Sequence, residues 1–115
     1  MSDVKEIEQS IEGLKAQVAL RDQVLKLEKN REFRNVILDG FCTKEAATYV
    51  QLSADPNLGK NEREDALALA QASGHIKRYL SVLKAMGNNA ESQIPRYEQG
   101  LVEARQEEDL GYEEE

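Results

Sequence analysis

Tryptophan is absent from this sequence, and its 115 residues include only two phenylalanines and four tyrosines. Burial must therefore come from leucine, isoleucine, valine and alanine, and a fully buried aliphatic side chain contributes about 1.5–3 kcal/mol. Ordering each residue costs a free energy of similar size. The length suits one domain with a thin core, so we expect the chain to gain stability from oligomerisation.

Cysteine and histidine each occur once, as Cys42 and His75. A single cysteine cannot form an internal disulfide, and with no signal peptide this favours a reducing, cytosolic compartment. One histidine and one cysteine do not make a metal site, and the charges of Glu62, Glu64 and Asp65 suit a helix amino terminus. We expect no metal and no cofactor, a buried Cys42, and a His75 at the core boundary or in solvent.

Phosphate-binding loops are absent from the sequence, because its seven glycines are scattered singly. No cysteine or serine stands in a recognisable arrangement with a base, and the sequence therefore predicts a protein that is not an enzyme. No apolar run approaches the roughly 18 residues that a membrane span needs. Ser2 stands where myristoylation requires glycine, so we expect no membrane contact.

Negative charge is concentrated at one end of the chain. Residues 1–102 hold 15 acidic and 14 basic residues, a net charge of −1, whereas residues 103–115 hold seven acidic residues and one basic residue, a net charge of −6. A general nucleic-acid binder gains affinity from a dense basic face, which this near-neutral body lacks. Nucleic acid is therefore a less favoured partner than protein.

Apolar residues near the amino terminus recur at alternating steps of three and four, the spacing of a coiled-coil seam. The predicted self-association seam consists of Val4, Ile7, Ile11, Leu14, Val18, Arg21 and Leu25. Arg21 occupies an apolar position, where it either fixes register and partner choice or extends its charge to solvent. We expect one long helix over residues 3–38, ended by Asp39-Gly40.

Three further helices are predicted. Thr43 can cap a short helix over residues 44–53, after which Asp55-Pro56-Asn57 forms a turn. A central helix over 61–86 begins at the cap Asn61 and stops at Gly87. Its apolar stripe is formed by Leu69, Ala72, Ile76, Tyr79, Leu83 and Met86.

The last predicted helix covers residues 90–105, with Pro95 in its first turn. Residues 106–115 form an acidic tail. The fold class predicted for residues 1–105 is an all-α antiparallel helical bundle with a long, coiled-coil-like N-terminal helix.

Two charged surfaces are candidate partner sites. Candidate nucleic-acid contacts are Lys26, Lys29, Arg31, Arg34, Lys77 and Arg78, although mixed charge of this kind is usually a solvated helix face. Candidate partner-docking residues in the acidic end are Glu107, Glu108, Asp109, Leu110 and Tyr112. Such an end solubilises the protein or covers a basic surface.

Four stretches resemble small helical proteins of tailed bacteriophages: EFRNVILDGF (residues 32–41), KEAA (44–47), ADPNL (54–58) and IKRYL (76–80). The resemblance covers about residues 28–85 and concerns the texture and order of elements. It brings no catalytic residues. It implies a protein of the phage head, neck or tail that works by contact, located in the virion or in the host cytoplasm during assembly.

These observations together predict a non-enzymatic phage structural or assembly protein. It would form a homo-oligomer and dock other virion or assembly proteins through helix packing. One alternative is a DNA-packaging or regulatory protein of the small-terminase type, which would use the basic residues of the first and third helices. Another is an acidic inhibitor that mimics nucleic acid through its tail.

Overall fold

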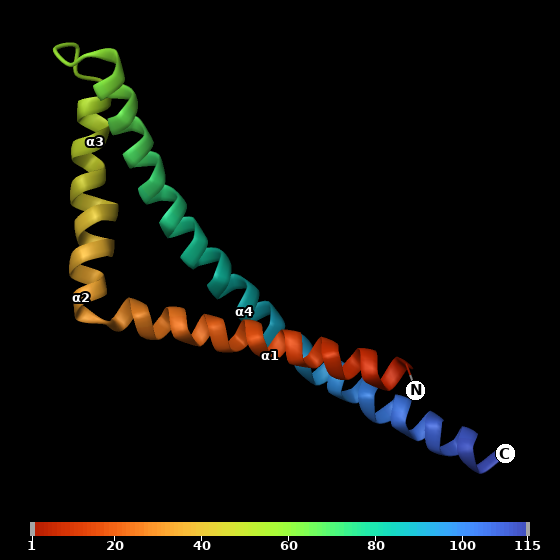
Figure 1. Ribbon diagram of the computed structural model, residues 1–115. Helices are drawn as coiled ribbons and strands as arrows, with labels where there is room; N and C mark the ends of the chain where they lie inside the picture. The colour runs from red at the N-terminus through yellow and green to blue at the C-terminus, as the bar shows by residue number, and fades with distance from the viewer. Residues whose placement is uncertain (1, 115) are drawn as a thin grey trace. The chain divides into compact units, whose positions relative to one another are not determined.

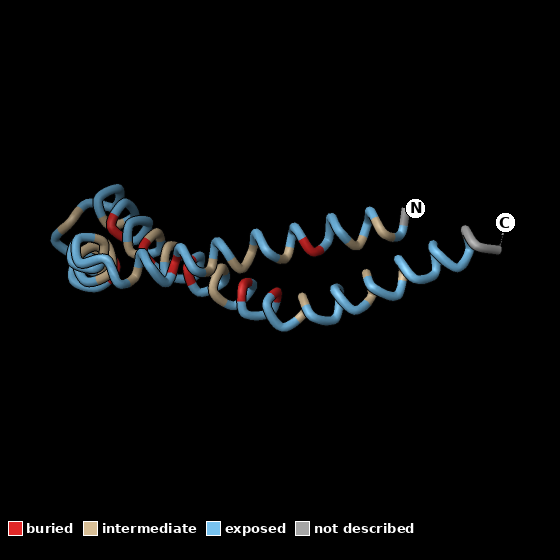
Figure 2. Tube along the Cα trace, turned by 90° about the horizontal axis from the view of Figure 1, so that it is seen from below, coloured by how far each residue is buried: buried red, intermediate tan, exposed pale blue. Residues whose placement is uncertain are grey.

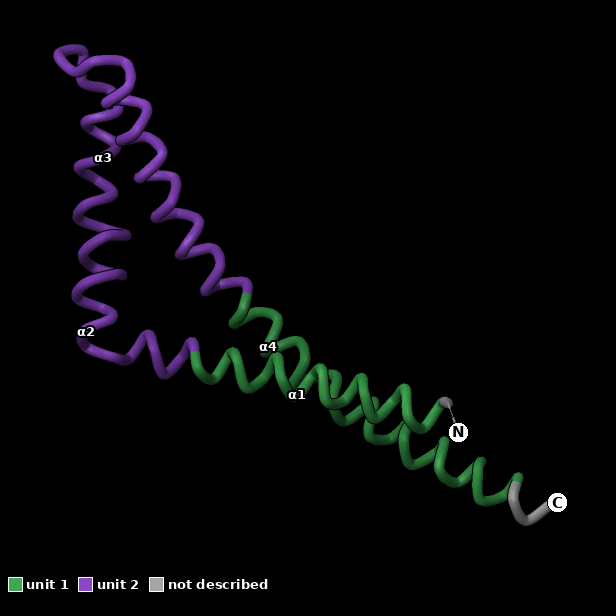
Figure 3. Tube along the Cα trace, in the orientation of Figure 1, with its two compact units in different colours: residues 1–23, 83–115 green, residues 24–82 purple. Residues whose placement is uncertain are grey.

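The computed structural model describes residues 2–114, with side chains for residues 3–111, and every element in this part of the chain is helical (Figure 1). The elements are α1 (Ser2–Lys29), α2 (Arg31–Phe33), the π-helix η1 (Arg34–Glu45), α3 (Ala46–Ser53) and α4 (Lys60–Glu114). They form two compact units, residues 1–23 with 83–115 and residues 24–82 (Figure 3). We call these unit 1 and unit 2. The predicted all-α class is confirmed.

Unit 1 is an antiparallel pair made from the beginning of α1 and the end of α4. Arg105 Nη2 lies 3.0 Å from Glu8 Oε1, and Arg21 forms an ion pair with Glu91, so the two helices run in opposite directions. Figure 2 shows buried positions on the facing sides of both helices. They include Ile11 and Ala90, which is fully buried.

Unit 2 packs η1 and α3 against the first half of α4. The backbone reverses at the predicted turn, where Asp55 Oδ1 accepts a hydrogen bond from the Asn57 N–H at 2.9 Å. The thiol of Cys42 donates to the carbonyl of Ser73 at 3.7 Å and ties η1 to α4. As predicted, Cys42 is buried and His75 is exposed.

The long helix expected over residues 3–38 is divided at Asn30. The backbone of Asn30 is extended (φ −70°, ψ 126°), and its side chain accepts a hydrogen bond from the Phe33 N–H at 2.8 Å. Asparagine is among the best helix caps because its short side chain reaches the free N–H groups of the first turn. This capping signal was overlooked in the sequence.

The expected helix end at Asp39-Gly40 is wrong, because η1 passes through both residues. Thr43 does not cap a helix: its hydroxyl donates to the carbonyl of Leu38, five residues earlier, at 2.7 Å. A Cβ on Gly40 would lie 2.8 Å from the carbonyl oxygen of Asn35. The missing side chain therefore accommodates the wider π-helical turn instead of ending the helix.

The expected stop at Gly87 and the new helix over residues 90–105 are also wrong, since α4 is continuous from Lys60 to Glu114. Gly87 is buried against Arg21 in unit 1. This packing compensates for the low helix propensity of glycine, which costs about 1 kcal/mol. Pro95 consequently lies inside a helix, where it leaves the carbonyl of Glu91 without its usual N–H partner.

The ends of α4 differ from the prediction as well. The first turn is closed by the Gly59 carbonyl, which accepts from the Arg63 N–H at 3.0 Å, so Asn61 is not the cap. The expected acidic tail over residues 106–115 is helical as far as Glu114. Between Glu103 and Glu114 the residues other than Gly111 are mostly good helix formers, which explains the continuation.

The buried face of α4 is rotated from the predicted stripe. Buried positions recur every seven residues at Ala66, Ser73, Leu80 and Gly87, the repeat of a coiled coil. Most of these residues are small, and small residues let helix backbones approach closely. The larger side chains of the predicted stripe consequently lie to one side of this face.

Candidate functional site

The predicted self-association seam lies within unit 1, except for its last member. Ile11 is buried, and Val4, Ile7, Leu14 and Val18 are half-buried. Figure 2 shows that the buried positions of α1 lie on the side facing α4. The remaining position, Leu25, is exposed and belongs to unit 2. The chain therefore covers much of its own seam, and self-association through it stays a prediction.

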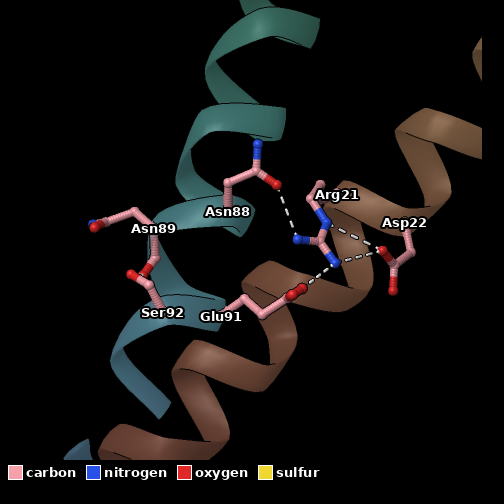
Figure 4. A network of polar contacts seen from close by, with 6 residues as sticks. All are labelled: Arg21, Asp22, Asn88, Asn89, Glu91 and Ser92. Carbon is pink, nitrogen blue, oxygen red and sulfur yellow. Dashed lines mark hydrogen bonds and ion pairs between the residues drawn. The ribbon is translucent and has the colours of Figure 1, made fainter. Parts of the chain in front are cut away.

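Arg21 is the centre of a polar network inside unit 1 (Figure 4). Its guanidinium donates to Asn88 Oδ1 at 2.9 Å, donates twice to Asp22 Oδ1 at 2.9 and 3.1 Å, and pairs with Glu91. Only 13% of the side chain is exposed. Of the two readings of Arg21, the structure favours the fixing of register, here between α1 and α4 of one chain.

Two features join the helix pair at Arg21: the charge of its guanidinium, and the close contact that Gly87 permits. Its hydrogen bond to Asp22, followed by that to Glu91, raises the pKa of Arg21 above its ordinary value, so the guanidinium stays charged throughout the accessible pH range. A Cβ on Gly87 would overlap the Cβ of Arg21 and lie 2.9 Å from its Cγ. Gly87, read from the sequence as a helix stop, and its neighbour Asn88 are thus contact residues.

An apolar stripe remains uncovered on the first half of α4. Within unit 2 it consists of Leu69, Ala72, Ile76 and Tyr79, and we call it the α4 outer stripe. Leu69 is 41% exposed and Tyr79 is 62% exposed, whereas Ala72 and Ile76 are half-buried. Leu69 and Tyr79 therefore leave apolar surface on this side of α4 available to a partner.

The six candidate nucleic-acid residues all belong to unit 2 and are all exposed. The break between α1 and α2 is flanked by Lys26, Lys29 and Arg31. Arg34 is the first residue of η1, and α4 carries Lys77 and Arg78. Within the described part of the chain, none of the six has an ion pair with a carboxylate. They are therefore available to solvent anions.

A pocket of about 330 Å³ in unit 2 has a mixed lining. Its residues are Glu28, Leu38, Asp39, Thr43, Lys77, Leu80 and Ser81. The Thr43 hydroxyl is already engaged by the Leu38 carbonyl, and both signs of charge meet at the opening. The arrangement does not select one ligand class.

The acidic docking candidates lie near the end of α4. Glu107, Glu108, Asp109 and Leu110 are exposed. The side chain of Tyr112 lies outside the described residues.

Among the described residues, no group of three or more histidine, cysteine, aspartate or glutamate side chains could hold a metal ion. None of the described helices combines the length and apolar character needed to cross a membrane.

Comparison with known proteins gives no relative: no protein-family model, no curated protein and no solved structure matches this chain.

Proposed function

We propose that this chain is a non-enzymatic structural or assembly protein that acts by helix packing, with copies of itself and with other proteins. The observation that carries the proposal is the α4 outer stripe, which leaves Leu69 and Tyr79 in solvent. Regular apolar surfaces of this kind mark protein interaction sites. An exposed stripe at helical spacing suits a partner that is itself a helix.

The setting we propose is the particle of a tailed bacteriophage, in its head, neck or tail. The resemblance of residues 28–85 to small helical phage proteins supports this setting. The acidic end supplies a second docking surface, through Glu107, Glu108, Asp109 and Leu110, for a partner with a basic face. Together the two surfaces suit a component that joins other proteins.

Light scattering over a range of protein concentrations tests the proposal. We expect the mass of the full chain to exceed that of one chain and to rise with concentration. Ile7→Glu then measures how much the partly covered seam contributes. A full chain that stays monomeric throughout would contradict the proposal.

DNA binding is the second candidate, because six basic residues of unit 2 are exposed and have no acidic partner among the described residues. A protein of this type would bind duplex DNA through phosphate contacts, and its affinity would fall steeply with salt. Fluorescence anisotropy with labelled duplex DNA checks this, and Lys29→Ala with Arg34→Ala should weaken any binding. The absence of binding at low salt removes this candidate.

A further inference from the structure

We infer that α1 is exchanged between two copies of this chain, so that the α1 of each copy pairs with the α4 of the other. The inference rests on the proposed function and names a second copy as the first partner. It concerns the contacts of unit 1 and a hinge at Asn30. Exchange of an identical element between copies needs no new interface, because each contact within one chain is remade between two chains.

The contacts of unit 1 identify the occupant, which is the sequence of α1 itself. The Arg21 guanidinium pairs with Glu91, and Gly87 leaves the space beside the Arg21 side chain. Farther along the same pair of helices, Arg105 donates to Glu8 at 3.0 Å. These contacts fix both the partner and the register of α4. The α1 of a second copy offers the same side chains in the same order, so it fits this part of α4 equally well.

The pair that α1 and α4 form in unit 1 has a thin core. Among the described residues of unit 1, only Ile11, Gly87 and Ala90 are buried. The other apolar seam residues in this unit are half-buried. Separation of the two helices therefore exposes little further apolar surface. Helices with few buried contacts open locally at a low free energy, and this opening is the step that exchange requires.

Asn30 is a hinge controlled by one backbone angle. Its φ of −70° is already helical, and only its ψ of 126° departs from the helical value of about −42°. The residues between 26 and 34 are otherwise mostly good helix formers, which is why the sequence predicts one helix over residues 3–38. Rotation of this ψ joins α1 to α2 in a continuous helix. It also changes the direction of α1 and so releases it from the α4 of its own chain.

The bent and the straight forms use the Phe33 N–H differently. In the bent form, the Asn30 side chain accepts its hydrogen bond at 2.8 Å. In a straight helix, the Phe33 N–H bonds to the carbonyl of Lys29, four residues earlier, and the cap is not needed. Substitutions at residue 30 therefore shift the balance between the two forms in a direction that depends on capping and helix propensity.

Sedimentation equilibrium of chains that differ at residue 30, each refolded at the same concentration, tests the hinge. Asn30→Ala removes the cap and favours a continuous helix, so we expect the dimer to become about tenfold stronger or more. Asn30→Gly is the matched control, because glycine keeps much of the cap preference and disfavours a continuous helix. It should leave the dimer no stronger than that of the wild-type chain. Circular dichroism verifies that both variants fold, and a weaker dimer for Asn30→Ala would contradict the hinge.

Cross-linking between two single variants tests the exchange itself. Glu8→Cys and Arg105→Cys place thiols on α1 and α4 where the two side chains meet in unit 1. Equal amounts of the two chains are unfolded and refolded together, and a short bis-maleimide reagent is then added. We expect a link that joins one chain of each kind, whereas each variant refolded alone should stay unlinked. The wild-type chain with its buried Cys42 is the control for unintended links.

The outcomes separate the exchange from the proposed function. If the full chain self-associates but the mixed variants do not link, the exchange is wrong and the assembly proposal survives. If Glu8→Cys alone links to itself, α1 pairs with α1 and the exchange is again wrong. A full chain that is monomeric at every concentration, with no link after joint refolding, contradicts both proposals. A link between unlike chains, together with a stronger dimer for Asn30→Ala, supports the inference.

Discussion

Gly87 allows α4 to lie closer to α1 than a residue with a side chain would permit. Because an added Cβ would overlap Arg21, Gly87→Ala should lower the free energy of unfolding by about 1–3 kcal/mol, as overpacking does. Urea unfolding followed by circular dichroism at one fixed protein concentration measures the change.

Gly13→Ala provides the matched control. Gly13 lies inside α1, and an added Cβ there would have no close neighbour outside its own helix within 4 Å. Alanine should stabilise that helix by about 0.5–1 kcal/mol, because glycine loses more backbone entropy on folding. Opposite signs for the two substitutions are the signature of a close helix contact, and a stabilising Gly87→Ala would disprove it.

Arg21 joins α1 to α4 through a planar group that contacts several acceptors at once. Arg21→Lys should lower the melting temperature, since one ammonium cannot reproduce the fork that reaches Asn88 and Glu91. A double-mutant cycle with Glu91→Gln should give a coupling that weakens with added salt. Strictly additive effects would show that the two side chains act independently.

At the scale of single elements, Asn30 sets the boundary between α1 and α2. Asn30→Ala removes the acceptor for the Phe33 N–H, and we expect a loss of about 0.5–2 kcal/mol in the free energy of unfolding. Asn57→Ala is the control, because Asn57 contributes only its backbone N–H to the turn with Asp55. An effect of the same size at both positions would argue against a specific cap.

The carboxyl-terminal part of α4 is helical although its side chains carry a large net negative charge. Its last turn carries no basic residue to complement the helix dipole. Glu107→Lys converts the like-charged Glu103–Glu107 pair into an attractive one, and should stabilise this segment by about 0.2–0.5 kcal/mol. Hydrogen exchange of residues 103–111 at low salt reports the change, which added salt should diminish.

Local signals in the sequence predicted which helices form better than they predicted the residues at which those helices begin and end. The turn at Asp55 follows from local chemistry and was predicted well. The start of α4 was predicted within one residue, although Asn61 is not its cap. Gly40 and Gly87 were misread, because glycine marks a helix end only when no neighbouring segment needs the space. At both positions the deciding atoms belong to residues that sequence reasoning did not connect with the glycine, Asn35 and Arg21.

The candidate surfaces were only partly predictable for a similar reason. The stripe through Leu69 and Tyr79 was identified from its spacing as the apolar face of the central helix. The structure buries Ala66, Ser73 and Gly87 instead, a repeat of small residues that gives little hydrophobic signal. Which of two adjacent stripes becomes buried depends on close backbone approach, which residue size alone does not reveal.

At the scale of the whole molecule, self-association links stability to concentration. A partner that binds only the folded state stabilises it by mass action, so the melting temperature should rise with protein concentration. Differential scanning calorimetry at several concentrations makes the comparison, and a constant melting temperature for the wild-type chain would contradict self-association.

The composition of unit 1 from the two ends of the chain has a consequence during synthesis. Glu8 and Arg105 are 97 positions apart, and a ribosome adds about 5–20 residues per second. The amino-terminal seam therefore waits roughly 5–20 seconds for its own partner helix. During that interval it is open to the seams of neighbouring nascent chains, so the rate at which a message is translated would influence whether unit 1 closes on itself or joins two chains.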